Sequence, residues 1–332
     1  MTARASVAAA MANIADVAGA TRDSIGRYFS LVSFIPSALL VAYAFSLFSS
    51  GVLNGPPRPE NVVRAAAQLN VSDAGVLILL SVGLGLILHP LQFAMVQFLE
   101  GYWGTGRIAQ QIRRVRITRH WERLLALRLR TGYYQRQLDL LAENGSPGER
   151  IALVSRRDEA ERLSANQPDE PELIMPTRLG NVLRYYEVMA GAAYQLDAIK
   201  VMPYIARVAS AEDMDYVNDQ RSNLDLAVRL SLVSVLAFVL SVALLWRYGL
   251  WLLVALAPYA LAVLSYRGAV VAADAYGQAF ATIIALNRFT LYERLHLPMP
   301  KSMPEERVRN VTLGRILDYS EFESVVYEHP QP

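Results

Sequence analysis

Histidine and arginine side chains are the residues of this chain whose type and spacing point to chemistry. His89 precedes Pro90 inside a long apolar stretch, and a cluster of arginines follows that stretch. A histidine within a membrane can line a water-filled path or sense protons, or it can be a satisfied structural residue beside a proline kink. The arginines can bind anions or anionic lipid head groups, or they can serve membrane threading alone. The cluster consists of Arg107, Arg113, Arg114, Arg116, Arg119 and Arg123.

The sequence patterns of common enzyme classes do not occur in this chain. There is no GxxxxGK[ST] loop, no HExxH and no GxSxG, and the chain contains no cysteine. The four histidines are too scattered to predict a metal site. No nucleic-acid reader motif accompanies the arginines. We therefore expect no catalysis, no cofactor, no metal and no nucleic-acid partner.

Four apolar stretches must position these side chains. They cover residues 28–48, 74–99, 230–246 and 249–266. Each has about the ~17–25 residues that a helix needs to cross a bilayer. The chain is 53% hydrophobic with a mean hydropathy of +0.23, which exceeds the roughly 45–50% apolar content of ordinary globular proteins. The sequence predicts an all-α integral membrane protein with four transmembrane helices in two hairpins.

The distribution of arginine predicts how these helices are threaded. The arginine cluster lies close behind the second stretch, whereas the connections within each pair carry few basic residues. Basic residues concentrate on the cytoplasmic side of membrane helices. We expect hairpins at 28–99 and 226–266, a helical cytoplasmic domain at 100–225 between them, and cytoplasmic termini. The expected location is the cytoplasmic (inner) membrane of a bacterium.

The remaining segments are expected to be helical or polar. Residues 1–27 read as an amphipathic segment, and Ser72 with Asp73 is placed to cap the second span. Thr177 should cap a helix in the cytoplasmic domain, and a helix from about residue 212 should run straight into the third span. The helical pattern of the fourth stretch continues as a cytoplasmic extension at 267–297. A polar tail follows at 298–332.

One stretch of the cytoplasmic domain reads PTRLGNVLR from Pro176, continues with Glu187 and ends with the YQLDAI stretch before Pro203. This stretch resembles a recurring element in a bacterial family of multi-pass membrane proteins without an assigned activity. The resemblance implies a membrane location and a helical cytoplasmic element. Spacing predicts that Arg184 pairs with Glu187. We expect Asn181, Arg184, Glu187, Asp197 and Asp274 to contact other helices or a partner, and Asp274 to pair with an arginine of another helix.

The layout of the chain leaves two functions open. Two hairpins joined to long cytoplasmic helices resemble bestrophin-type anion channels in topology alone. This resemblance implies a homo-oligomeric, channel-like assembly with a basic cytoplasmic vestibule, in contact with anionic lipids of the bilayer. The alternative is a membrane-anchored scaffold or receptor that docks a cytoplasmic protein partner without catalysis.

Overall fold

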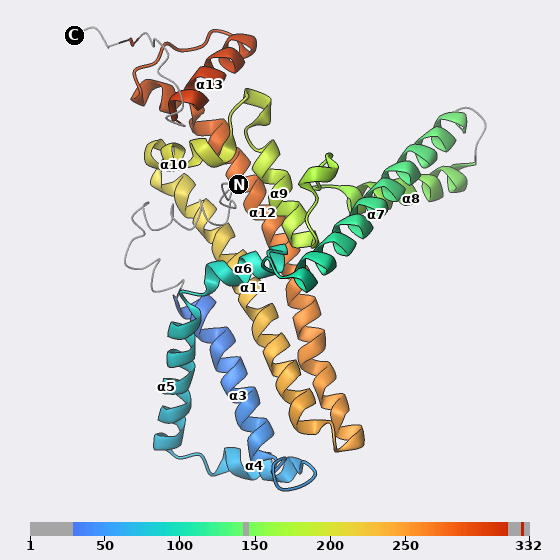
Figure 1. Ribbon diagram of the computed structural model, residues 1–332, viewed down its shortest axis with the longest axis vertical. Helices are drawn as coiled ribbons and strands as arrows, with labels where there is room; N and C mark the ends of the chain where they lie inside the picture. The colour runs from blue at the N-terminus through green and yellow to red at the C-terminus, as the bar shows by residue number, and fades with distance from the viewer. Residues whose placement is uncertain (1–28, 142–145, 318–326, 329–332) are drawn as a thin grey trace.

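The computed structural model describes residues 29–141, 146–317 and 327–328, and the regular elements in these ranges are all helices. The expected amphipathic segment at 1–27 lies outside the described residues. Figure 1 shows an elongated molecule with long helices at one end, a helical body at the other and an arm that projects from the side. The all-α prediction is confirmed for the described chain.

Four helical segments are long and apolar enough to cross a membrane. They lie in α3 (Ile35–Ser49) with the preceding η1 (Phe29–Phe34), in α5 (Val71–Leu88), in α11 (Ala211–Leu245), and in α12 (Leu256–Arg294) with the preceding η4 (Gly249–Ala255). Large apolar side chains such as Leu79, Ile87 and Leu264 are exposed on these helices. Exposed apolar surface of this extent needs a nonaqueous neighbour, which indicates a membrane protein.

Polar and apolar contacts join the first pair of these helices to the second. Helix α3 packs against both α5 and α11, and α11 packs along α12 (Figure 1). Tyr43 and Ser241 share a hydrogen bond of 2.6 Å between their hydroxyl oxygens, and the Tyr248 hydroxyl donates to the carbonyl of Val52 (2.9 Å). Leu47 and Leu245 are buried between them. The short α4 (Pro59–Ala67) lies in the connection between α3 and α5.

The second apolar stretch is not one continuous span, so the prediction of a helix over 74–99 is wrong. Helix α5 ends at Leu88, and a separate α6 (Gln92–Glu100) turns away from it (Figure 1). Pro90 explains the break, because proline lacks an amide donor and clashes with the preceding turn. The cap also differs from the expectation: Asn70 is the cap and accepts from the Asp73 amide (2.9 Å).

Two predictions about long helices are confirmed. Helix α11 begins at Ala211 and continues without a break into the third apolar stretch. Helix α12 runs past the fourth stretch to Arg294, where the chain soon meets Pro298 and Pro300. Both helices therefore extend from the end that holds the candidate membrane segments into the helical body.

The helical body has one hydrophobic core. It is built from α9 (Arg178–Met189), α10 (Ala198–Val208), α13 (Met303–Leu317) and the adjacent ends of α11 and α12. Leu179, Ile205, Val228, Phe280 and Ile284 are almost inaccessible to solvent within it. The short η2 (Pro171–Leu173) and η3 (Ala192–Tyr194) lie in its connections.

The first half of the expected polar tail over 298–332 contains a helix that packs on the body. Helix α13 occupies Met303–Leu317 and buries Leu313 in the core. Its buried Asn310 accepts a hydrogen bond of 2.6 Å from the Tyr292 hydroxyl, and Glu306 pairs with Arg288 (2.7 Å). Partners on α12 thus stabilise polar residues that the sequence alone marks as a solvated end.

The projecting arm consists of α7 (Arg107–Leu140) and α8 (Pro147–Ser164) (Figure 1). The two helices pack against each other, and Leu124 and Leu127 are buried on α7. Ser146 and Glu149 form a capping box at the start of α8. This reciprocal cap satisfies two amide groups that the first helical turn leaves without partners.

Candidate functional site

The C-terminal end of α6 is docked on the N-terminal end of α9. Gly101 ends α6 with φ of 107°, a conformation that favours glycine. The Thr177 hydroxyl donates to the carbonyl of Glu100 (2.9 Å) and accepts from the amide of Gly180 (3.0 Å). Thr177 is therefore the cap of α9, as predicted, and also the link between the two helices. The backbone carbonyl of Glu100 lies directly against Gly180.

This contact gathers four side chains into a polar cluster, which we name the acidic junction. It contains Glu100, Tyr102, Arg184 and Glu187. The Arg184 guanidinium pairs with the Glu187 carboxylate (2.5 Å) and donates to the Tyr102 hydroxyl (2.9 Å). Glu100 is 3% exposed, and its Oε1 has no hydrogen-bond partner among the described residues. Two buried carboxyl groups thus lie within electrostatic range of one guanidinium, which pairs directly with Glu187.

Burial and charge repulsion make Glu100 a weak acid. Its burial, followed by the nearby Glu187 carboxylate, raises the pKa of Glu100 to about 8, against the opposing effect of Arg184. The pKa of Tyr102 is also raised, chiefly by burial. A carboxyl group with such a pKa is protonated at neutral pH and can exchange its proton near pH 8. The acidic junction can therefore couple protonation to the packing of α6 against α9.

The acidic junction should make the stability of the protein fall as pH rises. Because the pKa of Glu100 is higher in the folded state than in the unfolded state, its stabilising contribution is complete below the unfolded pKa and is lost as pH rises toward 8. The loss between pH 6 and pH 8 is about 2 kcal/mol. We expect Glu100→Gln to remove this dependence. Thermal unfolding of detergent-solubilised protein across pH 5–9 measures the effect.

A matched control for Glu100→Gln is Glu159→Gln, which changes an exposed carboxylate on the arm. This control should retain the pH dependence of the wild-type protein. A Glu100→Gln protein whose unfolding temperature still falls between pH 6 and pH 8 would contradict the assignment to Glu100.

A second buried cluster ties α6 to α11. Gln92 stands at its centre: its amide nitrogen donates to the Asp225 carboxylate (3.1 Å), and its amide oxygen accepts from Arg229 Nε (2.9 Å). Arg229 is fully buried, and Arg221 lies 3.7 Å from the Asp225 carboxylate. We name these four residues the Gln92 bridge. Burying a charge is costly. A buried charged group is therefore either functional or held by polar partners that stabilise the structure.

The other predicted contact residues are placed by the structure as follows. Asn181 is buried and holds the loop before α9, accepting from the Met175 amide (2.8 Å) and donating to the Met175 carbonyl (3.0 Å). Asp197 caps α10 by accepting from the amides of Ile199 (3.1 Å) and Lys200. Both residues thus act within local structure in the described chain.

Asp274 of α12 contacts another helix, α9, and the hydrogen-bond donors that the described chain supplies to it are not arginines. Its carboxylate accepts from the Tyr186 hydroxyl of α9 (2.7 Å), from Asn166 (2.6 Å) and from Gln278 (3.2 Å). Arg178 lies within electrostatic range. Asp274 therefore joins α12 to α9 and to the segment that follows α8.

His89 does not occupy the interior of a span. It forms the C-terminal cap of α5, and its side chain is exposed at the turn toward α6. The six predicted arginines are all exposed along the first half of α7. Within the described chain, Arg116 donates a hydrogen bond to the Pro176 carbonyl (3.3 Å). Helix α6 lies between His89 and the arginine cluster along the chain.

One face of α7 carries a regular stripe of exposed residues, which we name the α7 stripe. Successive members are separated by four and three residues in strict alternation, which is the spacing of the contact face in a coiled coil. Apart from Arg136, its outer members are apolar or aromatic, and Ile108 (78%) and Leu129 (74%) are strongly exposed. The members are Ile108, Ile112, Val115, Arg119, Glu122, Ala126, Leu129, Tyr133, Arg136 and Leu140.

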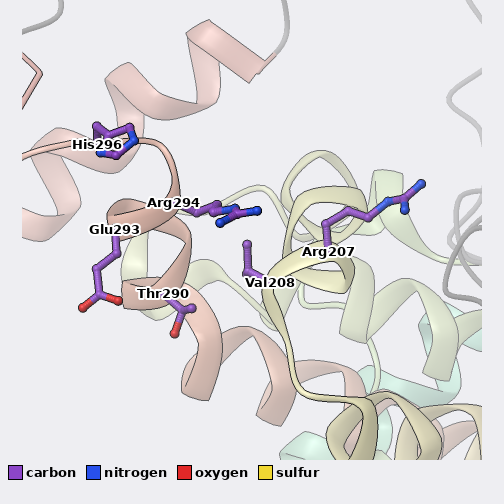
Figure 2. A pocket seen from close by; sticks show the side chains of 6 residues that line it. All are labelled: Arg207, Val208, Thr290, Glu293, Arg294 and His296. Carbon is purple, nitrogen blue, oxygen red and sulfur yellow. The ribbon is translucent and has the colours of Figure 1, made fainter. Parts of the chain in front are cut away.

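A shallow pocket of about 540 Å³ lies between α10 and the end of α12. Figure 2 shows that Arg294 lies toward Val208, whereas Arg207 and Glu293 point away from each other. Charged groups that do not converge cannot hold a substrate for reaction. Among the described residues, no group of His, Asp and Glu could hold a metal ion.

Sequence reasoning missed Glu100, Gln92 and Arg229. Glu100 and Arg229 adjoin predicted spans, and a charge at the end of an apolar stretch is also expected from ordinary membrane anchoring. Their burial depends on the turn after α5, which lays α6 against α9 and α11. No pattern in the sequence indicates this packing.

Comparison with known proteins gives no further assignment: no family model matches the chain, and neither a characterised protein nor a solved structure matches it.

Proposed function

We propose that this protein is a homo-oligomeric assembly of a bacterial cytoplasmic membrane, joined through α7 and forming a basic, channel-like vestibule. In this proposal the four membrane segments form two hairpins with cytoplasmic termini, and the arm projects on the cytoplasmic side. The observation that carries it is the α7 stripe. Apolar residues in coiled-coil spacing are exposed over most of a 34-residue helix, and such a face is stable in water when a second helix covers it.

The α7 stripe is complementary to a second copy of itself in the antiparallel direction. About a midpoint between His120 and Trp121, Arg119 is placed opposite Glu122 and Val115 opposite Ala126 of the second copy. The same midpoint places Ile112 opposite Leu129 and Ile108 opposite Tyr133 of the second copy. A parallel pair would instead set Arg119 against Arg119 and Glu122 against Glu122, which is unfavourable. Charge complementarity thus favours the antiparallel homodimer.

Membrane insertion restricts how the two copies can meet. Both copies enter one bilayer in the same direction, so their twofold axis stands along the membrane normal. The arm is inclined to α11 and α12 (Figure 1). In this proposal the arms of two copies therefore cross, and they approach each other most closely around the midpoint of the α7 stripe. Pairing brings the exposed arginines of the two α7 helices together, where they attract anions.

Disulfide cross-linking tests this arrangement in a chain that has no cysteine of its own. We expect the double variant Val115→Cys/Ala126→Cys to form covalent dimers in membranes under mild oxidation. The single variants Val115→Cys and Ala126→Cys should remain largely monomeric on a nonreducing gel, because each thiol faces an unmodified residue. The control is the double variant Arg130→Cys/Gly132→Cys, whose two positions do not belong to the α7 stripe.

Other outcomes of the cross-linking experiment would overturn parts of the proposal. Dimers from Val115→Cys alone would show parallel pairing, and no dimer from any variant would remove α7 as the joining surface. Chloride flux in liposomes that contain the cross-linked dimer tests the channel-like activity. A dimer without flux would exclude conduction and favour the scaffold that docks a cytoplasmic protein.

A further inference from the structure

An apolar groove runs between α11 and α12 at the level where the membrane segments meet α9. Its volume is about 640 Å³, and its wall is almost entirely apolar. Val235 and Phe238 contribute from α11, and Tyr259 and Val263 from α12. The rings of Phe238 and Tyr259 are in contact at one end, with centroids 5.5 Å apart. An open apolar groove on a membrane-facing surface is suited to a hydrocarbon chain.

The opposite end of the groove carries positive charge. Arg178 of α9 and Arg267 of α12 both line it, beside Tyr266. Arg267 is exposed and makes no hydrogen bond or ion pair with the described chain. One terminal nitrogen of Arg178 donates to the Ala165 carbonyl (2.8 Å), whereas Nη1 has no hydrogen-bond partner among the described residues.

The charges around this end leave it receptive to an anion. Asp274 lies within range of Arg178, but its carboxylate already accepts hydrogen bonds from Tyr186 and Asn166. Arg123 of α7 also acts electrostatically on Arg178: burial, followed by this like charge, lowers the pKa of Arg178 against the opposing effect of Asp274. Arg267 then adds a positive charge for which the described chain supplies no counterion.

The length of the groove matches a lipid chain in one leaflet. Eight residues separate Tyr259 from Arg267 on α12, a rise of about 12 Å. Half of a hydrocarbon core measures roughly 15 Å. A chain that ends at the Phe238–Tyr259 contact thus has its head group close to the two arginines.

We propose that this groove binds one anionic phospholipid, with an acyl chain between α11 and α12 and its phosphate at Arg178 and Arg267. The lipid connects the membrane segments to α9, the helix that carries half of the acidic junction. This site is separate from the α7 stripe and belongs to a single copy of the chain, so it does not depend on the proposed assembly.

Lipid titration followed by native mass spectrometry tests the proposal on the delipidated full-length protein in nonionic detergent. Dioleoylphosphatidylglycerol should bind more tightly than dioleoylphosphatidylcholine, which has the same chains. Arg267→Gln should weaken phosphatidylglycerol about fivefold and phosphatidylcholine much less. Val235→Trp, which fills the groove from a half-exposed position, should weaken both lipids. Arg247→Gln, two residues past the C-terminal end of α11, is the matched control and should change neither.

Three results would overturn the proposal. Equal affinity for the two lipids would exclude recognition of the negative charge, and an unchanged Arg267→Gln protein would place that recognition elsewhere. Unchanged binding by Val235→Trp would exclude the groove. Competition by millimolar inorganic phosphate, with no effect of Val235→Trp, would assign the arginines to a free anion instead of a lipid.

Discussion

Replacing Arg229 by alanine should destabilise the protein by about 3–5 kcal/mol, because it removes one charge from a buried polar network. Arg229 is fully buried and donates to Gln92, which in turn donates to Asp225. Without the guanidinium, the buried Asp225 carboxylate keeps Arg221 at 3.7 Å but loses a neighbouring positive charge. The contact of α6 with α11 should weaken at the same time. Chemical unfolding of the detergent-solubilised protein measures the loss.

Two further variants separate this effect from simple loss of a large side chain. Asp225→Asn combined with Arg229→Ala removes the negative charge as well, so the double variant should recover part of the lost stability. Arg64→Ala, on the exposed face of α4, should change the stability by less than about 0.5 kcal/mol. A double variant no more stable than Arg229→Ala would exclude the uncompensated charge as the cause.

Gly180→Ala should destabilise the protein by about 1–3 kcal/mol, because the added methyl group has no room. It would overlap the carbonyl oxygen of Glu100 and approach Met175 Cβ to 2.9 Å. The neighbouring atoms are mostly backbone, so α6 and α9 must separate to admit it. The Thr177 hydroxyl would then lose its bond to Glu100. The unfolding midpoint in denaturant and the pH dependence that Glu100 confers should both change.

Gly132→Ala is the matched control, since it makes the same chemical change within a helix. Gly132 lies in α7 with no other atom near the added methyl group. Alanine stabilises a helix over glycine by about 0.5–1 kcal/mol. The two substitutions should therefore have opposite signs. If Gly180→Ala also stabilised the protein, α6 and α9 would not pack closely at Gly180, and the explanation from lack of room would be wrong.

The sequence predicted those features that depend on local composition. Apolar stretches of sufficient length identified four candidate membrane segments, and the continuous helical pattern correctly extended α11 and α12 far beyond them. Thr177 was recognised as a cap, and the spacing of Arg184 and Glu187 predicted their ion pair. These properties follow from hydrophobicity, helix periodicity and capping chemistry, which act over a few residues.

Predictions failed where distant segments meet. The packing of α13 and the burial of Glu100 each require a partner that is distant along the chain. Polar residues such as Glu306 and Asn310 are indistinguishable from a solvated tail until their partners on α12 are known. The residues that adjoin a position in the sequence do not indicate such contacts, because the burial of a side chain depends on the whole fold.

The sequence by itself determined that this is a helical protein whose apolar segments suit a membrane. Only the tertiary structure decided where charge is buried and which surfaces remain uncovered. The acidic junction and the Gln92 bridge exist because α6 turns back onto α9 and α11. The α7 stripe is informative because α8 covers the other side of the helix and leaves the stripe exposed. Both features depend on packing between helices, which the order of residues specifies only through the complete fold.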